Sequence, residues 1–326
     1  MSHQRYRWRL LDAGPLLLDG GGMFGVIPKV VWSRNVECDE LNRIKIRHNC
    51  LLLESESADP ALGRPRHVVF ETGTGDKLNE KMSKIFGLSG RTVETAIAEA
   101  GARTDTIDDV FVTHLHFDHA GGLTCRPREG ETPDWTAPDA RSASGESMGV
   151  VRTFPNATVH SQGLEWATAQ ANNSVMTRTY YRDHLEPIAG QMRLAEAPLP
   201  MPHDRIPNHG ELPRSPLEDR WVEPVPGVRC FSVPGHTWGQ QAMLFTDDQG
   251  REICFVPDVM PTAWHVGKTY SLSYDVEPYT SMISRHWLLH EAVERDWLLV
   301  LPHDPNTAVV RARREGDWFA LEPVDA

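Results

Sequence analysis

Val110–Gly122 reads VFVTHLHFDHAGG, a stretch dense in side chains that bind metal ions. His114, His116, Asp118 and His119 fall within six positions, directly after an apolar run. The apolar run predicts a buried strand, and side chains alternate along an extended segment, so the first two histidines should face the same side. Several histidines are costly to desolvate without partners. The cluster therefore indicates a metal site at the end of a strand.

Three later segments have the same form, an apolar strand followed by a residue of the metal-binding type. CFSVPGHTWG leads to His236, ICFVPDVMP leads to Asp258, and WLLVLPHDPN leads to His303. Imidazole nitrogens and carboxylate oxygens without thiolates suit Zn, Fe, Mn or Co. The joint occurrence of the four segments strengthens the prediction of a metal site.

Ten short apolar runs predict strands, from NCLLLES near residue 50 to WFALEPV near the end of the chain. Helical patterns lie between them, over residues 92–102, 163–171 and 281–296. Runs of strands separated by helices favour two sheets covered by helices.

The sequence resembles the metallo-β-lactamase-fold hydrolases over residues of about 45 to 305. The resemblance is carried by the order of its motifs, which is HxHxDH, then the His of PGH, then an Asp and then a late His. The segments NCLLLE and ETGTGDK are most similar to the branch of the N-acyl-homoserine lactonases and methyl parathion hydrolases. The resemblance implies an α/β (α+β) fold, a four-layer αββα sandwich with a two-metal site at one edge of the sheets. We expect one domain over 1–326, with an N-terminal cap segment over about 1–45 and inserts over about 125–153 and 198–227.

The resemblance also implies how the ligands divide between two ions. One ion would be held by His114, His116 and His236, and the other by Asp118, His119 and His303, with Asp258 bridging them. A hydroxide that bridges both ions would attack a small ester or lactone, with a phosphotriester as a further option. The expected cofactors are two divalent metal ions, Zn first, with Fe, Mn or Co as alternatives. Asp118 and Asp258 are also assigned to catalysis.

The chain departs from the family pattern near the expected site. Glu71 stands where the family usually has Asp, and Pro261 stands where the lactonases place a Tyr three residues after the bridging Asp. That phenol therefore cannot be transferred to this position. His265 and Tyr274, in PTAWHVGKTYSLSYD, are the candidates to donate a proton to the leaving group. Glu71 and Asp76 are expected to support the ligand loop.

The composition argues against several classes of partner. The net charge of −12 fits neither nucleic acid nor an anionic membrane. No apolar run approaches the length of a membrane span, and we expect no signal peptide in the first residues. Five scattered cysteines without a CxxC pair favour a reducing, cytoplasmic compartment. A small molecule is the expected partner, and the apolar stretch GMFGVIPKVVW could either cap the site or form a homodimer.

Two other functions stay open at this stage. One is a mononuclear iron oxygenase or other redox enzyme on the same fold, although the complete second ligand set favours two ions. The other is a non-catalytic metal-binding protein, which would require a damaged site, and none of the seven ligands is missing.

Overall fold

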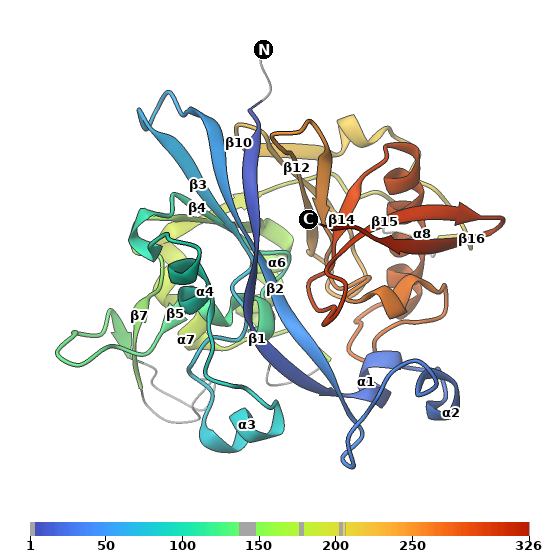
Figure 1. The fold of residues 1–326 in the computed structure, drawn as a ribbon, viewed down its shortest axis with the longest axis horizontal. Coiled ribbons are helices and arrows are strands. Elements are labelled where there is room, and N and C mark those ends of the chain that lie inside the picture. Colours follow the sequence, from blue (N-terminus) through green and yellow to red (C-terminus); the bar gives the residue numbers. More distant parts are fainter. Residues whose placement is uncertain (1–3, 137–147, 176–178, 202–204, 206, 326) are drawn as a thin grey trace.

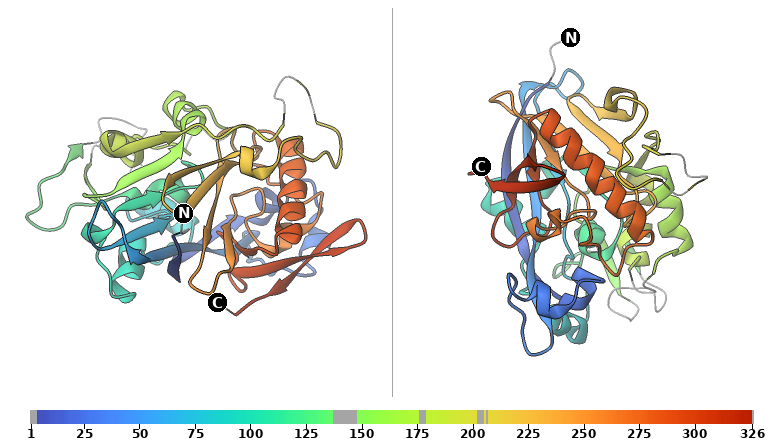
Figure 2. Two further views of the ribbon diagram at one scale, coloured as in Figure 1. Left: turned by 90° about the horizontal axis from the view of Figure 1, so that it is seen from above. Right: turned by 90° about the vertical axis from the view of Figure 1, so that its right-hand side faces the viewer.

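Two large mixed sheets pack face to face at the centre of the molecule (Figures 1 and 2). The computed structural model describes residues 4–136, 148–175, 179–201, 205 and 207–325. The first sheet has the order β1 (Tyr6–Asp19), β2 (Arg43–Ala58), β3 (Pro65–Phe70), β4 (Asp109–Phe111), β8 (Thr158–Gln162) and β9 (Met192–Ala195). The second has the order β10 (Trp221–Val225), β11 (Val228–Ser232), β12 (Gln241–Thr246), β13 (Glu252–Phe255), β14 (Leu298–Val300), β15 (Val309–Glu315) and β16 (Trp318–Pro323). Each of the ten strands predicted from the sequence forms.

The side-chain alternation of the central strands creates the layers. In β2, Leu51 and Leu53 belong to the cluster between the two sheets, whereas Leu52 belongs to the cluster under the helices of the first half. In β13, Phe255 faces the partner sheet and Cys254 faces the opposite way. Central strands such as β12 and β14 are buried on both faces, and their sequences are therefore almost continuously apolar. The expected four-layer αββα sandwich is confirmed.

Helices cover the two outer faces of the sandwich. Val93 and Ile97 of α4 pack on the first sheet, and Trp287 and Leu288 of α8 pack on the second. Figure 2 shows α8 lying across the second sheet. The α-helices are α1 (Gly20–Phe24), α2 (Lys29–Trp32), α3 (Glu80–Ile85), α4 (Val93–Glu99), α5 (Phe117–Ala120), α6 (Gly163–Ala171), α7 (Arg182–Leu185) and α8 (Pro278–Glu294). The 3-10 helices are η1 (Thr104–Thr106), η2 (Gly121–Leu123), η3 (Glu186–Gln191), η4 (Leu217–Asp219) and η5 (Ala263–Val266).

The segment expected to cap the site divides into two parts. Tyr6–Asp19 is the edge strand β1, which pairs with β2 over most of its length. Beyond it, α1 and α2 extend away from the sheets at one end of the molecule (Figure 1). Met23 and Trp32 of this part are buried, whereas Val26 is 84% exposed and Val30 is 69% exposed. A role of this apolar surface in forming a homodimer stays a prediction.

The two expected inserts contain more regular structure than their compositions suggest. Around the first, β5 (Thr124–Cys125), β7 (Gly149–Arg152) and β6 (Trp135–Thr136) form a small three-stranded sheet, while 137–147 lie outside the described residues. The second includes η4 and β10, and its residues 202–204 and 206 also lie outside them. Within the described ranges, no helix is long and apolar enough to cross a membrane. All five cysteines are free, and a cytoplasmic location stays a prediction.

Candidate metal centre

The ends of four strands bring the predicted ligands together. His114 and His116 follow β4, and the short helix α5 carries Asp118 and His119. The other three predicted ligands, His236, Asp258 and His303, follow β11, β13 and β14. These three strands run in the same direction, because β11 and β13 are both antiparallel to β12 and β13 is parallel to β14. Their carboxyl ends therefore meet at one edge of the sandwich.

Three overlapping groups of side chains have the spacing of a metal site. They are His114, His116 and His236; His114, His119 and Asp258; and Asp118, His119 and His303, with ligand atoms within 4.8 Å of one another in each group. Asp258 lies between the outer groups, with Oδ2 at 3.6 Å from His236 Nε2 and Oδ1 at 3.6 Å from His303 Nε2. The structure thus brings together all seven side chains that the sequence predicted as ligands.

The ring nitrogens are arranged for a cation. His303 Nδ1 donates to the carbonyl of Arg47 at 2.9 Å, and His119 Nδ1 donates to Glu71 Oε2 at 2.9 Å. In neutral rings, both Nε2 atoms then carry lone pairs, and they face each other at 3.0 Å. Two lone pairs repel at this distance unless a cation or an extra proton lies between them. The residues therefore fit a bound metal ion.

Two buried polar atoms at the centre support the same conclusion. His114 Nε2 and Asp258 Oδ1 have no hydrogen-bond partner within the part of the chain that the structure describes. Buried polar atoms are normally paired, so an unpaired nitrogen and an unpaired oxygen in one cluster require an explanation. Coordination of metal ions would satisfy both atoms.

The local charge favours cations as well. Burial alone would lower the pKa of His119, but Glu71, Asp258 and Asp118 outweigh burial and raise it well above the usual value. Burial, together with the neighbouring histidines, lowers the pKa of His114 well below the usual value. Burial opposes ionisation of Asp258, yet His119, His303 and His236 hold its pKa below the normal range. In the metal-free protein, the centre therefore places the ionised Asp258 beside the neutral ring of His114 and the protonated ring of His119. A metal ion that binds His119 would displace that proton.

Two ligand histidines are each oriented by a buried carboxylate behind them. His119 is held by Glu71, which also accepts the Thr113 backbone N–H at 2.6 Å. His236 Nδ1 donates to Asp275 Oδ1 at 2.9 Å. Such partners fix the ring orientation and make the metal-facing nitrogen a better ligand. The role of Asp275 was not predicted from the sequence. It is one acidic residue in the long segment after Asp258, and no motif marks it.

Comparisons with known proteins agree with this architecture. A family model described as Anti-Pycsar protein Apyc1 matches residues 82–126, which include the HxHxDH segment. A protein of Mycobacterium tuberculosis named a probable metallo-hydrolase is 25% identical over 313 residues, covering 87% of this chain and 85% of that protein. A solved structure of a probable metal-dependent hydrolase from Staphylococcus aureus gives a TM-score of 0.74 at 23% identity, with 100% of both chains covered.

Two further solved structures share the fold. A hydrolase named AbOPH, described as a member of the β-lactamase superfamily, gives a TM-score of 0.67 at 14% identity and covers 100% of this chain and 99% of its own. AidC, described as a dizinc quorum-quenching lactonase in complex with a product, gives 0.66 at 15% identity and covers 100% and 97%. The chain has the metallo-β-lactamase fold.

In this metallo-β-lactamase fold, the ligand cluster opens into an apolar cavity. The cavity has a volume of about 470 Å³ and is lined on one side by ligands of the cluster, among them Asp118 and Asp258. The remaining wall is largely hydrophobic and comes from β1, α1, α3, the first residue of α5 and the loop near Leu272. It includes Leu17, Leu18, Met23, Met82, Ile85 and Phe86. The site can therefore accept a molecule with a sizeable apolar part beside the metal-binding side chains.

The two predicted proton donors lie in different places. Tyr274 lines the cavity together with Asp118. His265 is fully buried, with Nδ1 at 2.8 Å from Thr262 Oγ1 and Nε2 at 2.8 Å from the Met23 carbonyl, and its ring stacks on Phe24. Both nitrogens of His265 have protein partners, and the residue does not line the cavity. This placement removes the basis for a role of His265 in donating to a leaving group.

Asp76, the other expected support of the ligand loop, contacts no ligand histidine. Its carboxylate accepts the Arg126 backbone N–H at 3.2 Å and so holds the start of the first insert.

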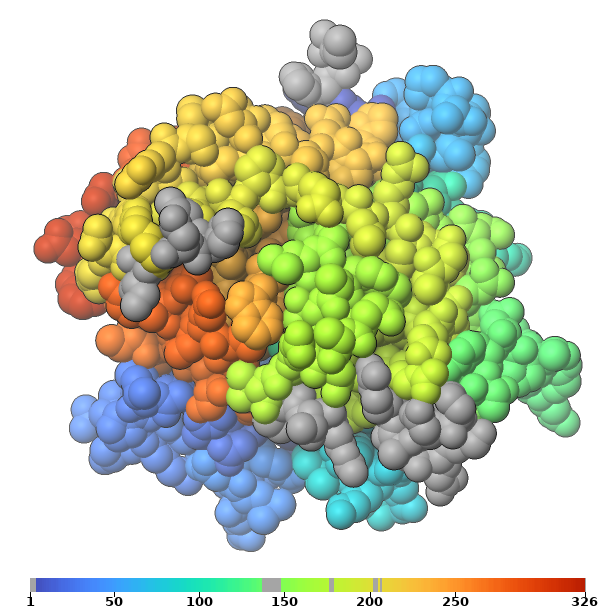
Figure 3. Space-filling model, turned by 180° about the vertical axis from the view of Figure 1, so that it is seen from behind, coloured from blue at the N-terminus to red at the C-terminus, as the bar shows by residue number. Residues whose placement is uncertain are grey.

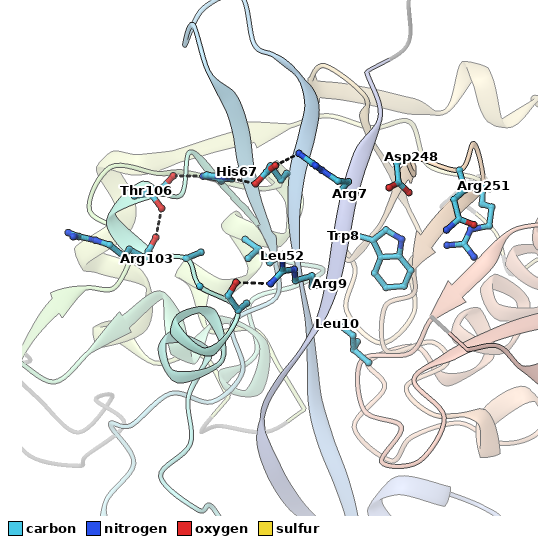
Figure 4. Close-up of a pocket in the computed structure, with 15 residues that line it drawn as sticks. Arg7, Trp8, Arg9, Leu10, Leu52, His67, Arg103, Thr106, Asp248 and Arg251 are labelled. Carbon is cyan, nitrogen blue, oxygen red and sulfur yellow. Dashed lines mark hydrogen bonds and ion pairs between the residues drawn. The ribbon is translucent and has the colours of Figure 1, made fainter.

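A larger cavity lies beside β1 and β2 (Figure 4), and none of the ligand groups found among the described residues lines it. Its volume is about 990 Å³, and arginines are frequent in its lining. They have partners already: Arg7 pairs with Glu54, and Arg9 donates to the Ala100 carbonyl at 2.8 Å.

Proposed function

We propose that this chain is a hydrolase that uses two divalent metal ions to cleave a small ester or lactone with an apolar acyl part. The observation that carries the proposal is the position of two adjoining ligand groups in the wall of an apolar cavity. Zn is the first expectation for the ions, with Fe, Mn or Co as alternatives, because the ligands are imidazoles and carboxylates. A phosphotriester remains a second substrate class for the same site.

The ligand set supplies the reactive groups. When bound, the two ions supply an activated water and a Lewis acid that polarises the bond to be cleaved. The protein positions them with Asp258 between the two groups and keeps the surrounding cavity apolar. Low polarity strengthens electrostatic interactions with a developing negative charge.

Tyr274 is the candidate donor to that charge. Burial raises the pKa of its phenol, and Asp19 and Asp118 raise it further, so the hydroxyl keeps its proton at neutral pH. A protonated phenol in the cavity wall can donate a hydrogen bond to an oxyanion or to a leaving oxygen. Asp118, in the same wall, would be both a ligand and an acceptor for a proton released during the reaction.

The second ligand group favours the hydrolase over a redox enzyme with one iron. With a single ion in the first group, His119 Nε2 and His303 Nε2 would still face each other at 3.0 Å. The relatives point the same way: one is named a probable metallo-hydrolase and another a dizinc lactonase.

A hydrolysis series tests the proposal. The protein is purified without added metal, its metal content is measured, and it is assayed with aryl esters and acyl lactones whose acyl chains differ in length. Each methylene buried in the cavity contributes about 0.8 kcal/mol, so kcat/KM should rise about fourfold per methylene until the cavity is full. We expect about two ions per chain and activity that chelation abolishes.

Asp258→Asn is the matched variant, because it keeps the shape of the side chain but weakens the contact to both groups. Its activity should be lost while the fold is retained, as judged by circular dichroism. About one iron per chain, together with oxygen uptake and no hydrolysis of any series member, would replace this proposal with the redox alternative.

A further inference from the structure

Glu165, outside both ligand groups, is a buried carboxylate that connects the two halves of the metal centre. It lies in the first turn of α6 and has no exposed surface. Oε1 accepts the backbone N–H of Leu115 at 3.0 Å and the hydroxyl of Tyr180 at 3.1 Å. Oε2 accepts the hydroxyl of Thr237 at 2.6 Å. Three hydrogen bonds to a buried carboxylate hold that side chain and its three partners in one arrangement.

Two of the three groups that Glu165 binds, the Leu115 backbone N–H and the Thr237 hydroxyl, belong to residues next to the proposed ligands. Leu115 separates His114 from His116, and Thr237 follows His236 directly. One carboxylate thus holds the backbone of the first two ligands and the loop of the third, although these segments are more than 100 positions apart in the sequence. The ring of its third partner, Tyr180, packs against His116 with centroids 5.1 Å apart.

The chain is shaped locally to allow this bridge. A Cβ atom on Gly239 would lie 2.1 Å from the backbone nitrogen of Glu165, so a glycine is needed where the loop after His236 passes α6. Seen from behind, the residues around α6 lie between the orange segments of the C-terminal half and the green segments of the N-terminal half (Figure 3). The helix is therefore placed to hold both halves at once.

We propose that Glu165 is a positioning residue for the ion held by His114, His116 and His236. The proposal rests on the two-ion centre of the proposed function. Glu71 has the corresponding role for the other group, because it contacts His119 directly. Each ion site then has its own buried carboxylate, and the two sites should lose affinity separately.

The experiment is a stepwise titration of the metal-free full chain with Zn²⁺ against a chromophoric chelator. The two affinities are assigned with His116→Ala and His303→Ala, since each variant removes a ligand from one group only. Outer partners of metal ligands typically change affinity 10- to 100-fold. Glu165→Gln should weaken the His116 site about 10-fold and Glu165→Ala more, whereas Glu71→Gln should mainly weaken the His303 site.

Thr237 provides a milder test if Glu165→Ala does not fold. Thr237→Val removes the hydroxyl that binds Glu165 and should weaken the His116 site, and Thr237→Ser should restore it. A merely structural role would lower the midpoint of thermal unfolding of the metal-free protein without this selectivity.

Equal weakening of both sites, or no weakening of either, would overturn the assignment of Glu165. A wild-type chain that binds fewer than two Zn²⁺ would overturn it together with the two-ion centre. Failure to hydrolyse any ester or lactone would instead count against the proposed reaction alone, because the titration measures no turnover.

Discussion

Replacing Asp275 with Asn should weaken the metal centre through His236, the residue that it orients. In the native structure, Asp275 Oδ1 accepts from His236 Nδ1 at 2.9 Å, and Oδ2 accepts from the Leu272 backbone N–H at 3.2 Å. Both side chains of the ion pair are almost fully buried, at 3% and 1% exposure. An Asn amide has one acceptor, so one of the two N–H groups must face an NH₂ group.

The magnitude follows from these two contacts. Leaving one buried donor unpaired costs about 1–3 kcal/mol of folding stability. Loss of the carboxylate behind a metal-binding histidine typically reduces metal affinity 10- to 100-fold, or about 1.4–2.7 kcal/mol. We therefore expect Asp275→Asn to fold with reduced stability and to bind the ion of the His236 group at least tenfold more weakly.

Proton binding gives a second readout in the metal-free protein. Burial lowers the pKa of His236, but Asp275 and Asp258 together raise it above its usual value. A raised pKa means that this interaction stabilises the metal-free fold fully below about pH 6.5 and is lost as the pH rises through the folded value. In Asp275→Asn, the pKa of His236 measured by NMR titration should fall below that of the wild type.

Asp247→Asn is the control for a general loss of stability. Asp247 is also fully buried and accepts two backbone N–H groups, from Gln249 and Arg251, in a turn between β12 and β13. This variant should unfold more easily yet bind metal like the wild type. Unchanged metal affinity and an unchanged pKa of His236 in Asp275→Asn would refute the reasoning.

Three further perturbations test other parts of the structure. Removing metal with a chelator should lower the midpoint of thermal unfolding, and free Zn²⁺ at 100 times its Kd should restore about 2.7 kcal/mol per site; an unchanged midpoint would contradict a bound ion. Tyr274→Phe should lower kcat about 100-fold with little change in KM, and full activity of this variant would exclude the donor role. Gly22→Ala should act similarly, because the added Cβ would lie 1.9 Å from the Tyr274 hydroxyl, whereas Gly190→Ala, whose Cβ would meet no atom within 4 Å, is the control. Burial lowers the pKa of His265 in the folded protein to about 4. As the pH falls below about 6.5, this residue therefore takes up a proton in the unfolded chain before it does so in the folded one. The metal-free protein should lose about 2 kcal/mol of folding stability from this residue between pH 7 and pH 5. Urea unfolding of His265→Gln should show a smaller loss, and an identical pH dependence would count against this explanation.

The side chains that gather at the proposed metal centre could be predicted from the sequence, because each of the four segments that carry them begins at the end of a strand. Apolar runs of period two identify the strands, and a polar residue at such an end is conspicuous, as at His236 or Asp258. The strand β1 was missed because RYRWRLLDAGPLLLD carries charges on its exposed face and has a register shift between Asp12 and Pro15. A long edge strand of this kind lacks the even alternation of a buried one.

Contacts that join distant segments could not be predicted. Asp275 lies 39 positions from His236, and Glu165 lies 50 positions from Leu115 and 72 from Thr237, so no local spacing links these residues. The surroundings of His265 could not be predicted either. It follows Asp258 closely in sequence, but its ring stacks on Phe24 and contacts the Met23 carbonyl, and it does not line the cavity.

The division of the ligands between the two sheets has a consequence for how the chain could be assembled. Each ion would take two ligands from the first half and one from the second, His236 or His303, with Asp258 also from the second. Neither half alone holds a complete site. Two fragments produced separately, divided between Ala195 and Leu217, should therefore reassociate more tightly when Zn²⁺ is present, with the ions acting as cross-links between them.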